Sequence, residues 1–197
     1  GGRLVDEGDQ VLMVSSKGLS ARFPSDDDTL RPMGRATGGV VGMKLKRGDA
    51  TVSLDVIRPD MHEDAYVVTI TDGGFGKRTL VSEWVPKGRA IIGVRAMRIV
   101  EERGSLVGAM VCRDTDTIFA IASNGVVIRT PVSEIRPSGR DTMGVVLMNL
   151  AAGDSVVAIA RAGEAEDEAE LEGEDVVRDE AELEEPAAEP QNPSQAP

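Results

Sequence analysis

Residue types that build common catalytic and structural sites are scarce in this chain of 197 residues, which has one cysteine, Cys112, and one histidine, His62. A single cysteine excludes an internal disulfide framework and suits a reducing cytoplasm. A lone histidine in a polar loop lacks partners for a zinc or acid–base site. No apolar run approaches the ~18 residues of a membrane span, and no signal peptide is visible. We therefore expect a cytoplasmic chain with no metal or cofactor of its own and no membrane partner.

Aromatic residues make up only 3% of the chain, so its core must be built from Val, Ile, Leu, Ala and Met. The apolar content of 41% is enough for such a core. Glycine is frequent and runs with helical periodicity are few, which favours β structure with many turns. The chain begins with Gly1 rather than Met. We therefore expect a piece of a longer protein, in which residues 1–10 are a linker or the end of a preceding unit.

A glycine pattern occurs three times in the chain. Each copy has a Gly-Arg pair, a glycine five residues after the first glycine, and a methionine four residues further on. The three sets are Gly34, Arg35, Gly39 and Met43; Gly88, Arg89, Gly93 and Met97; and Gly139, Arg140, Gly144 and Met148. Upstream, Gly18, Gly74 and Gly125 each stand four residues before an arginine, namely Arg22, Arg78 and Arg129. A shared register over three copies indicates one duplicated supersecondary unit.

Each copy reads as a short β meander. Aligned on the glycines, Leu12, Val68 and Phe119 coincide, and so do the residues two places later, as on one face of a strand. A polar turn with glycine and a second strand follow, which predicts a β-hairpin, and two further strands complete the copy. Four strands in about 50 residues are typical of a propeller-like blade. We predict an all-β fold with blades over about 11–60, 61–115 and 116–162, and the recurring methionines as core residues.

The net charge of −12 is distributed unevenly along the chain. From Gly163 onward there are 14 acids and one base, and this segment, 163–197, ends in Pro-rich sequence. It has too few large apolar residues to offset its ordering entropy, so we predict a disordered acidic tail. The preceding 162 residues carry +1, with basic windows of +4 over 17–47, +5 over 77–98 and +1 over 129–149. An acidic protein can therefore present a basic band.

Several stretches resemble the C-terminal domain of the DNA gyrase A subunit, especially of the actinobacterial kind: LRPMGRATGGVVGMKL, TDGGFGKRT, RGSLVGAMV, NGVVIRT and GRDTMGVVLMNL. They span roughly residues 11–161. The resemblance implies a β-pinwheel, in which four-stranded blades exchange strands with their neighbours and curve into a disc whose basic rim bends DNA. Three blades would be a partial pinwheel, and we expect strand exchange to leave the first blade incomplete with an exposed edge.

The resemblance also implies partners and chemistry outside this chain. The partners are double-stranded DNA, the gyrase B subunit, with which an A2B2 complex forms at the nucleoid, and the rest of the gyrase A subunit. Strand cleavage by a tyrosine with Mg²⁺ belongs to the upstream part of the A subunit, whereas ATP hydrolysis belongs to the B subunit. This chain alone is expected to catalyse nothing. The family's box, Gln-basic-Arg-Gly-Gly-basic-Gly, is degenerate here: the stretch from Pro86 to Gly93 keeps only Lys87, Gly88, Arg89 and Gly93.

Ten cations of the three basic windows are our candidates for contact with DNA phosphate. They are Lys17, Arg22, Arg35, Lys77, Arg78, Lys87, Arg89, Arg95, Arg129 and Arg140. A curved surface with one cationic loop per blade can follow a duplex without reading its bases. The last two stand in a window diluted by Glu134 and Asp141. The plainer interpretation is that the glycines only form turns and the arginines only solvate them.

Two other functions stay open at this point. One is the matching domain of topoisomerase IV, which the degenerate box favours. The other is a propeller-like protein-interaction module with no DNA role. A P-loop interpretation of Gly73 to Lys77 fails, because Arg78 stands where Ser or Thr would hold Mg²⁺.

Overall fold

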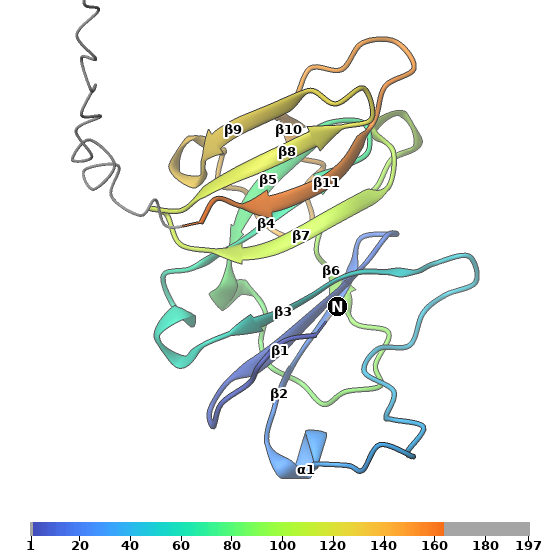
Figure 1. Cartoon of the computed structure of the whole chain (residues 1–197), viewed down its shortest axis with the longest axis vertical. Helices are drawn as coiled ribbons and strands as arrows, with labels where there is room; N and C mark the ends of the chain where they lie inside the picture. The colour runs from blue at the N-terminus through green and yellow to red at the C-terminus, as the bar shows by residue number, and fades with distance from the viewer. Residues whose placement is uncertain (1, 164–197) are drawn as a thin grey trace, which may run out of the picture. The chain divides into compact units, whose positions relative to one another are not determined.

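The computed structural model describes residues 2–163, which form three antiparallel sheets with almost no helix (Figure 1). The predicted acidic tail, apart from Gly163, lies outside the described residues. We call the sheets the first, second and third blade. The longer strands are β1 (Gln10–Ser15), β2 (Leu19–Pro24) and β3 (Thr51–Ile57) in the first; β4 (Tyr66–Thr71), β5 (Phe75–Leu80) and β7 (Leu106–Cys112) in the second; and β8 (Thr117–Ala122), β9 (Val127–Pro131) and β11 (Val156–Arg161) in the third.

Short helical turns connect the strands. They are α1 (Asp27–Leu30) and the 3₁₀ turns η1 (Pro59–Met61), η2 (Val81–Glu83), η3 (Glu101–Arg103) and η4 (Val132–Glu134). The acidic run at the start of α1 has a local explanation. The Asp26 carboxylate accepts a hydrogen bond from the backbone N–H of Thr29 at 2.8 Å and caps the turn.

Two-residue strands are exchanged between neighbouring blades. Strand β6 (Val94–Arg95), which belongs to the second copy, pairs with β2 of the first blade. Strand β10 (Val145–Val146), from the third copy, pairs with β5 of the second blade. The sheet orders are therefore β3-β1-β2-β6, β10-β5-β4-β7 and β11-β8-β9. Strand exchange agrees with the resemblance, but its direction corrects our expectation: the first blade has four strands, and the third has three within the described range.

Two turn glycines allow the segment that follows each exchanged strand to pack directly against the turn. Gly74 has φ +81°, and a Cβ built there would lie 2.3 Å from the carbonyl oxygen of Met148, just after β10. Gly18 has φ +76° and would meet the carbonyl oxygen of Met97 at the same distance. Only glycine satisfies both the left-handed backbone and the contact. Gly125, the third counterpart, has φ +86° with open space around it, because its blade receives no exchanged strand in this structure.

The core fills the spaces between successive blades. Leu12 of β1 packs in a cluster with residues of the second blade, and Val68 of β4 packs against residues of the third. This side of each blade therefore faces the next one. Phe119, their counterpart on β8, is half-buried, because no following blade covers it in the part of the chain described. The recurring methionines Met43, Met97 and Met148 are all buried, as the repeat predicts.

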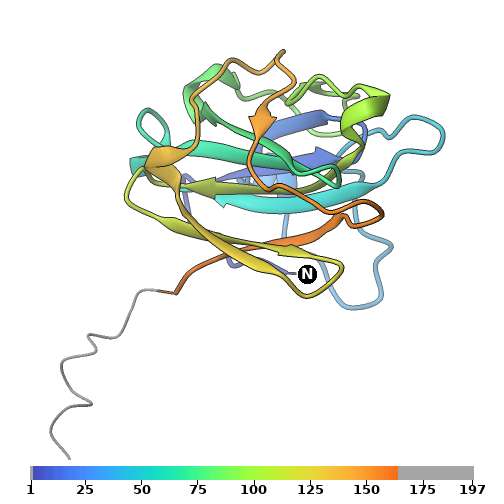
Figure 2. The ribbon, with the colours of Figure 1, turned by 90° about the horizontal axis from the view of Figure 1, so that it is seen from above.

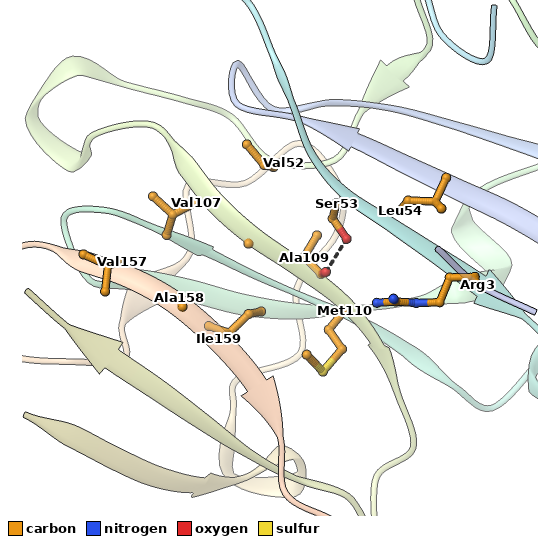
Figure 3. A pocket seen from close by; sticks show the side chains of 11 residues that line it. Arg3, Val52, Ser53, Leu54, Val107, Ala109, Met110, Val157, Ala158 and Ile159 are labelled. Carbon is orange, nitrogen blue, oxygen red and sulfur yellow. Dashed lines mark hydrogen bonds between the residues drawn. The ribbon is translucent and has the colours of Figure 1, made fainter. Parts of the chain in front are cut away.

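Strands β3, β7 and β11, each at one edge of its own sheet, lie side by side and line a pocket of about 310 Å³ (Figure 3). The Ser53 hydroxyl on β3 donates a hydrogen bond to the carbonyl oxygen of Ala109 on β7 at 2.6 Å. A Cβ at Gly108 would lie 2.6 Å from the Ile159 side chain, so glycine allows β11 to approach β7. Seen from above, the yellow and orange strands of the third blade lie at one side of the stacked sheets (Figure 2).

Candidate nucleic-acid interface

The three Gly-Arg loops are joined to one another in chain order. We call residues 34–43, 88–97 and 139–148 together the loop row. The N–H of Ala90 donates to the carbonyl oxygen of Gly42 at 2.7 Å, which ties the second loop to the first. The N–H of Arg98, one residue after the second loop, donates to the carbonyl oxygen of Thr142 at 3.0 Å and ties the second to the third. The loops therefore form one continuous edge rather than three separate surfaces.

The arginine of the Gly-Arg pair reinforces these ties in two copies. Nη1 of Arg89 donates to the carbonyl oxygen of Val41 at 3.4 Å, and Nη1 of Arg140 donates to that of Arg95 at 3.3 Å. Val41 and Arg95 are equivalent positions in the repeat, so the contact is the same in both places. Each guanidinium is half-buried between two loops. Arg35, the counterpart in the first copy, is exposed. In these two copies the arginine of the Gly-Arg pair therefore holds neighbouring loops together, and it also adds positive charge to them.

Three of the ten candidate cations are buried and serve the fold instead. The exposed fractions are 5% for Arg22, 0% for Lys77 and 8% for Arg78. Nη1 of Arg22 donates to the carbonyl oxygens of Val81 and Trp84 at 2.9 and 2.8 Å, and so ties the first blade to the turn at η2.

Arg78 makes the equivalent tie one blade further on. Its Nη2 donates to the carbonyl oxygen of Ser133 at 3.1 Å, and its Nη1 pairs with Asp114. Nζ of Lys77 donates to the carbonyl oxygens of Gly139 and Arg140 at 2.6 and 2.7 Å. Burial lowers the pKa of the Lys77 ammonium to about 8. These three cations bind backbone carbonyls inside the protein, so they are not exposed as our expectation of DNA contact requires.

The other candidates lie at or near the surface. Lys17, Arg35, Lys87 and Arg95 are exposed in or beside the loop row. Lys17 belongs there because the next residue, Gly18, accepts a hydrogen bond from Ala96. Arg129 is exposed too, but it lies on β9, the edge strand of the third blade. It occupies the position at which Arg22 and Arg78 tie one blade to the next, so it stands apart from the loop row.

Our list of candidates left out other exposed cations of the three basic windows, although Arg31 and Arg136 are equivalent repeat positions, and so are Lys44 and Arg98. The omitted cations are Arg31, Lys44, Lys46, Arg47, Arg98 and Arg136. The signal that could have found them is the charge of the three basic windows, which counts every lysine and arginine regardless of register.

A carboxylate interrupts the basic edge between the second and third loops. Oδ1 of Asp141 accepts hydrogen bonds from Nη1 of Arg95 at 2.5 Å and from Nε of Arg98 at 3.1 Å. These two hydrogen bonds, of which the one from Arg98 has the larger effect, lower the pKa of the Asp141 carboxyl to about 2. An open cleft of about 620 Å³ adjoins the pair and is also lined by Glu83. The Glu83 carboxylate accepts a hydrogen bond from the N–H of Arg140 at 3.0 Å.

Among residues 2–163, no group of three or more His, Cys, Asp or Glu side chains is placed to hold a metal ion. The helices in this range are all too short to span a membrane.

A family model described as the DNA gyrase C-terminal domain, a β-propeller, matches residues 9–58, 65–113 and 116–162. The chain belongs to the DNA gyrase C-terminal domain family. The DNA gyrase A subunit of Streptomyces coelicolor is 51% identical over 180 residues, which are 91% of this chain and 20% of the relative. Its counterpart in Mycobacterium tuberculosis is 44% identical over 164 residues, 83% of this chain and 19% of the relative. The chain therefore spans about a fifth of the length of these gyrase subunits.

Solved structures of the gyrase family and of a related enzyme share the fold. A structure of the DNA gyrase A C-terminal domain matches with a TM-score of 0.71 and 28% identity, over 80% of this chain and 52% of that one. The C-terminal domain of DNA topoisomerase IV matches with a TM-score of 0.74 and 26% identity, over 81% of this chain and 48% of that one. The predicted all-β pinwheel and the predicted family are both confirmed.

Proposed function

We propose that this chain binds and bends duplex DNA as the C-terminal wrapping region of a gyrase A subunit. In this role it supports negative supercoiling by an A2B2 enzyme with gyrase B, in the cytoplasm at the nucleoid. The chain supplies no catalytic group and no cofactor site. Strand cleavage with Mg²⁺ takes place elsewhere in the A subunit, whereas ATP is hydrolysed on the B subunit.

The observation that carries this proposal is the loop row. Three loops, one from each copy, are hydrogen-bonded in series, and exposed Arg35, Lys87 and Arg95 lie along them. A continuous cationic edge fits a continuous line of phosphates, whereas three isolated basic turns do not. Burial of Arg22, Lys77 and Arg78 does not weaken the argument, because their hydrogen bonds hold the blades and the third loop in place.

Binding by this edge is electrostatic and independent of base sequence. Each lysine or arginine that neutralises a phosphate releases a condensed counterion, and this release drives association. Exposed glycines such as Gly34 and Gly88 have open space around them, so the backbone can approach a phosphate there and offer its N–H. In this proposal, DNA that follows successive loops bends, and phosphate contacts offset the bending energy.

Two other functions, a topoisomerase IV domain and a protein-interaction module, are less well supported. The topoisomerase IV neighbour is 26% identical, whereas the gyrase subunits described above are 44–51% identical, which favours gyrase. An interaction module without a DNA role would leave the cations of the loop row without a ligand.

The test is a gel shift of the chain with a linear duplex over a series of salt concentrations. The four exposed candidates in or beside the loop row, Lys17, Arg35, Lys87 and Arg95, offer four phosphate contacts. Four contacts predict a slope of about −3.6 for log K against log [salt], or a loss of about 150-fold between 50 and 200 mM. Replacing Lys87 and Arg35 together by Ala should reduce the magnitude of the slope by about 2. Absence of any shift at low salt would refute the proposal and leave the interaction module.

A further inference from the structure

The acidic residue in the third loop of the loop row has no counterpart in the other two. Asp141 follows the arginine of the Gly-Arg pair, where the first and second copies have Ala36 and Ala90. Its two cationic partners, Arg95 and Arg98, both come from the second copy. A contact found in one blade only is not needed to build a blade, since the first and second blades have no such acid in their loops.

The contact has the form of a phosphate complex. One carboxylate oxygen accepts from two guanidinium groups, at 2.5 and 3.1 Å, as a phosphate oxygen would. The two arginines come from positions three residues apart at the end of β6, and both face the third loop. Asp141 therefore occupies the place on the loop row where a phosphate would meet two cations at once.

The side chains of the ion pair are about half exposed to solvent. The side chain of Asp141 is 53% exposed, and those of Arg95 and Arg98 are each 51% exposed. Exposed ion pairs contribute little net free energy and are screened by salt. The cleft beside them, lined by Arg140 and Thr142 among others, is open. A phosphate can therefore replace the carboxylate without unfolding any part of the loop.

We propose that Asp141 is a built-in competitor of DNA phosphate, which occupies Arg95 and Arg98 in the free protein and weakens binding at the junction of the second and third blades. This inference rests on the proposed DNA-binding function of the loop row. Asp141 acts in two ways: it engages two cations that would otherwise meet phosphate, and its own charge repels the DNA backbone. The result is a basic edge that holds DNA less tightly at one of its two loop junctions.

The test compares the whole chain with its Asp141→Asn variant, in duplex binding over a salt series. The amide cannot form the ion pairs, so we expect Asp141→Asn to bind about three- to tenfold more tightly at 0.1 M salt. The salt slope should become steeper by about 1 to 2, because two arginines gain phosphate partners. Asp141→Ala should give the same direction. Adding Arg95→Ala and Arg98→Ala to the Asn variant should abolish the gain.

The matched control is Asp64→Asn, which removes the same charge from an exposed turn residue that is not part of the loop row. It should shift affinity far less than the Asp141 change. If all three proteins bind DNA alike, with the same salt slope, the competitor role is refuted while DNA binding stands. If none of them binds at low salt, the proposed function itself fails and the inference with it. Tighter binding by the Asp141→Asn variant than by the wild type and by Asp64→Asn would support the competitor role.

Discussion

The buried lysine beneath the third loop leads to a quantitative prediction about pH. Lys77 has no exposed surface, and burial lowers the pKa of its ammonium from 10.5 to about 8. Below pH 8 the group is charged in both the folded and the unfolded chain. Between about 8 and 10.5 the folded protein has lost this proton while the unfolded chain keeps it. Unfolding then takes up a proton, so the contribution of Lys77 to stability rises with pH.

The size of the effect follows from the two pKa values. A shift from 10.5 to about 8 corresponds to about 3 kcal/mol over the full window, of which about 2 kcal/mol falls between pH 7.5 and 9.5. A neutral amine still has two N–H groups for the carbonyl oxygens of Gly139 and Arg140, so deprotonation does not break this clamp. The free energy of unfolding should therefore increase, not decrease, as Lys77 loses its proton.

The assay is urea denaturation of the wild type and the Lys77→Met variant at pH 7.5, 8.5 and 9.5. Methionine does not titrate, so the wild type should gain about 2 kcal/mol relative to the variant over this range. The Cys112 thiol, whose pKa burial raises to about 12, contributes an opposite slope above pH 9, but both proteins carry it. Exposed Lys87 supplies the control, since Lys87→Met should follow the wild type. If the free energies of unfolding of the wild type and Lys77→Met changed equally with pH, the lowered pKa of Lys77 would be disproved.

Three further predictions use positions that are equivalent in the repeat but differ in their surroundings. Gly74→Ala should lower the free energy of unfolding by more than about 3 kcal/mol, because its Cβ would meet a backbone carbonyl. Gly125→Ala has only the strain of a positive φ and should cost about 1 to 2 kcal/mol. Urea denaturation distinguishes the two variants, and equal losses would contradict the exchanged strand. Arg22→Met leaves the buried carbonyl oxygen of Trp84 without its hydrogen bond and should lower stability by about 1 to 3 kcal/mol, while exposed Arg129→Met should change it by less than about 0.5 kcal/mol. Similar changes in Tm would contradict an interblade tie. Removing every residue after Ala162 deletes 14 acids and should tighten duplex binding at low salt, because tethered carboxylates compete with phosphate; unchanged affinity would remove that role for the tail.

The repeat register allowed the fold to be predicted, because glycines with a positive φ and alternating apolar residues encode hairpins locally. The buried methionines followed from the same register. The direction of strand exchange did not, because β6 and β10 are only two residues long and their sequence does not specify which blade they join. Pairing at that length depends on where the neighbouring blade lies.

The candidate site was predictable as a set of loops but not as a set of atoms. A recurring arginine has the same sequence signature whether it faces solvent, as Arg129 does, or ties two blades together, as Arg22 does. The pairing of Asp141 with Arg95 and Arg98 joins residues more than 40 positions apart in the chain. Charge counting treated Asp141 only as a residue that lowers the net positive charge of its window. Burial and partner choice depend on how the blades pack, which the local sequence does not contain.

Bending of a duplex by the loop row changes DNA topology, which can be measured. A nicked circular plasmid is resealed in the presence of the chain, the protein is removed, and the topoisomers are separated on a gel. We expect a shift in linking number that grows with protein concentration and disappears at high salt. An unchanged distribution at low salt, at protein concentrations that saturate the plasmid, would contradict bending by the loop row.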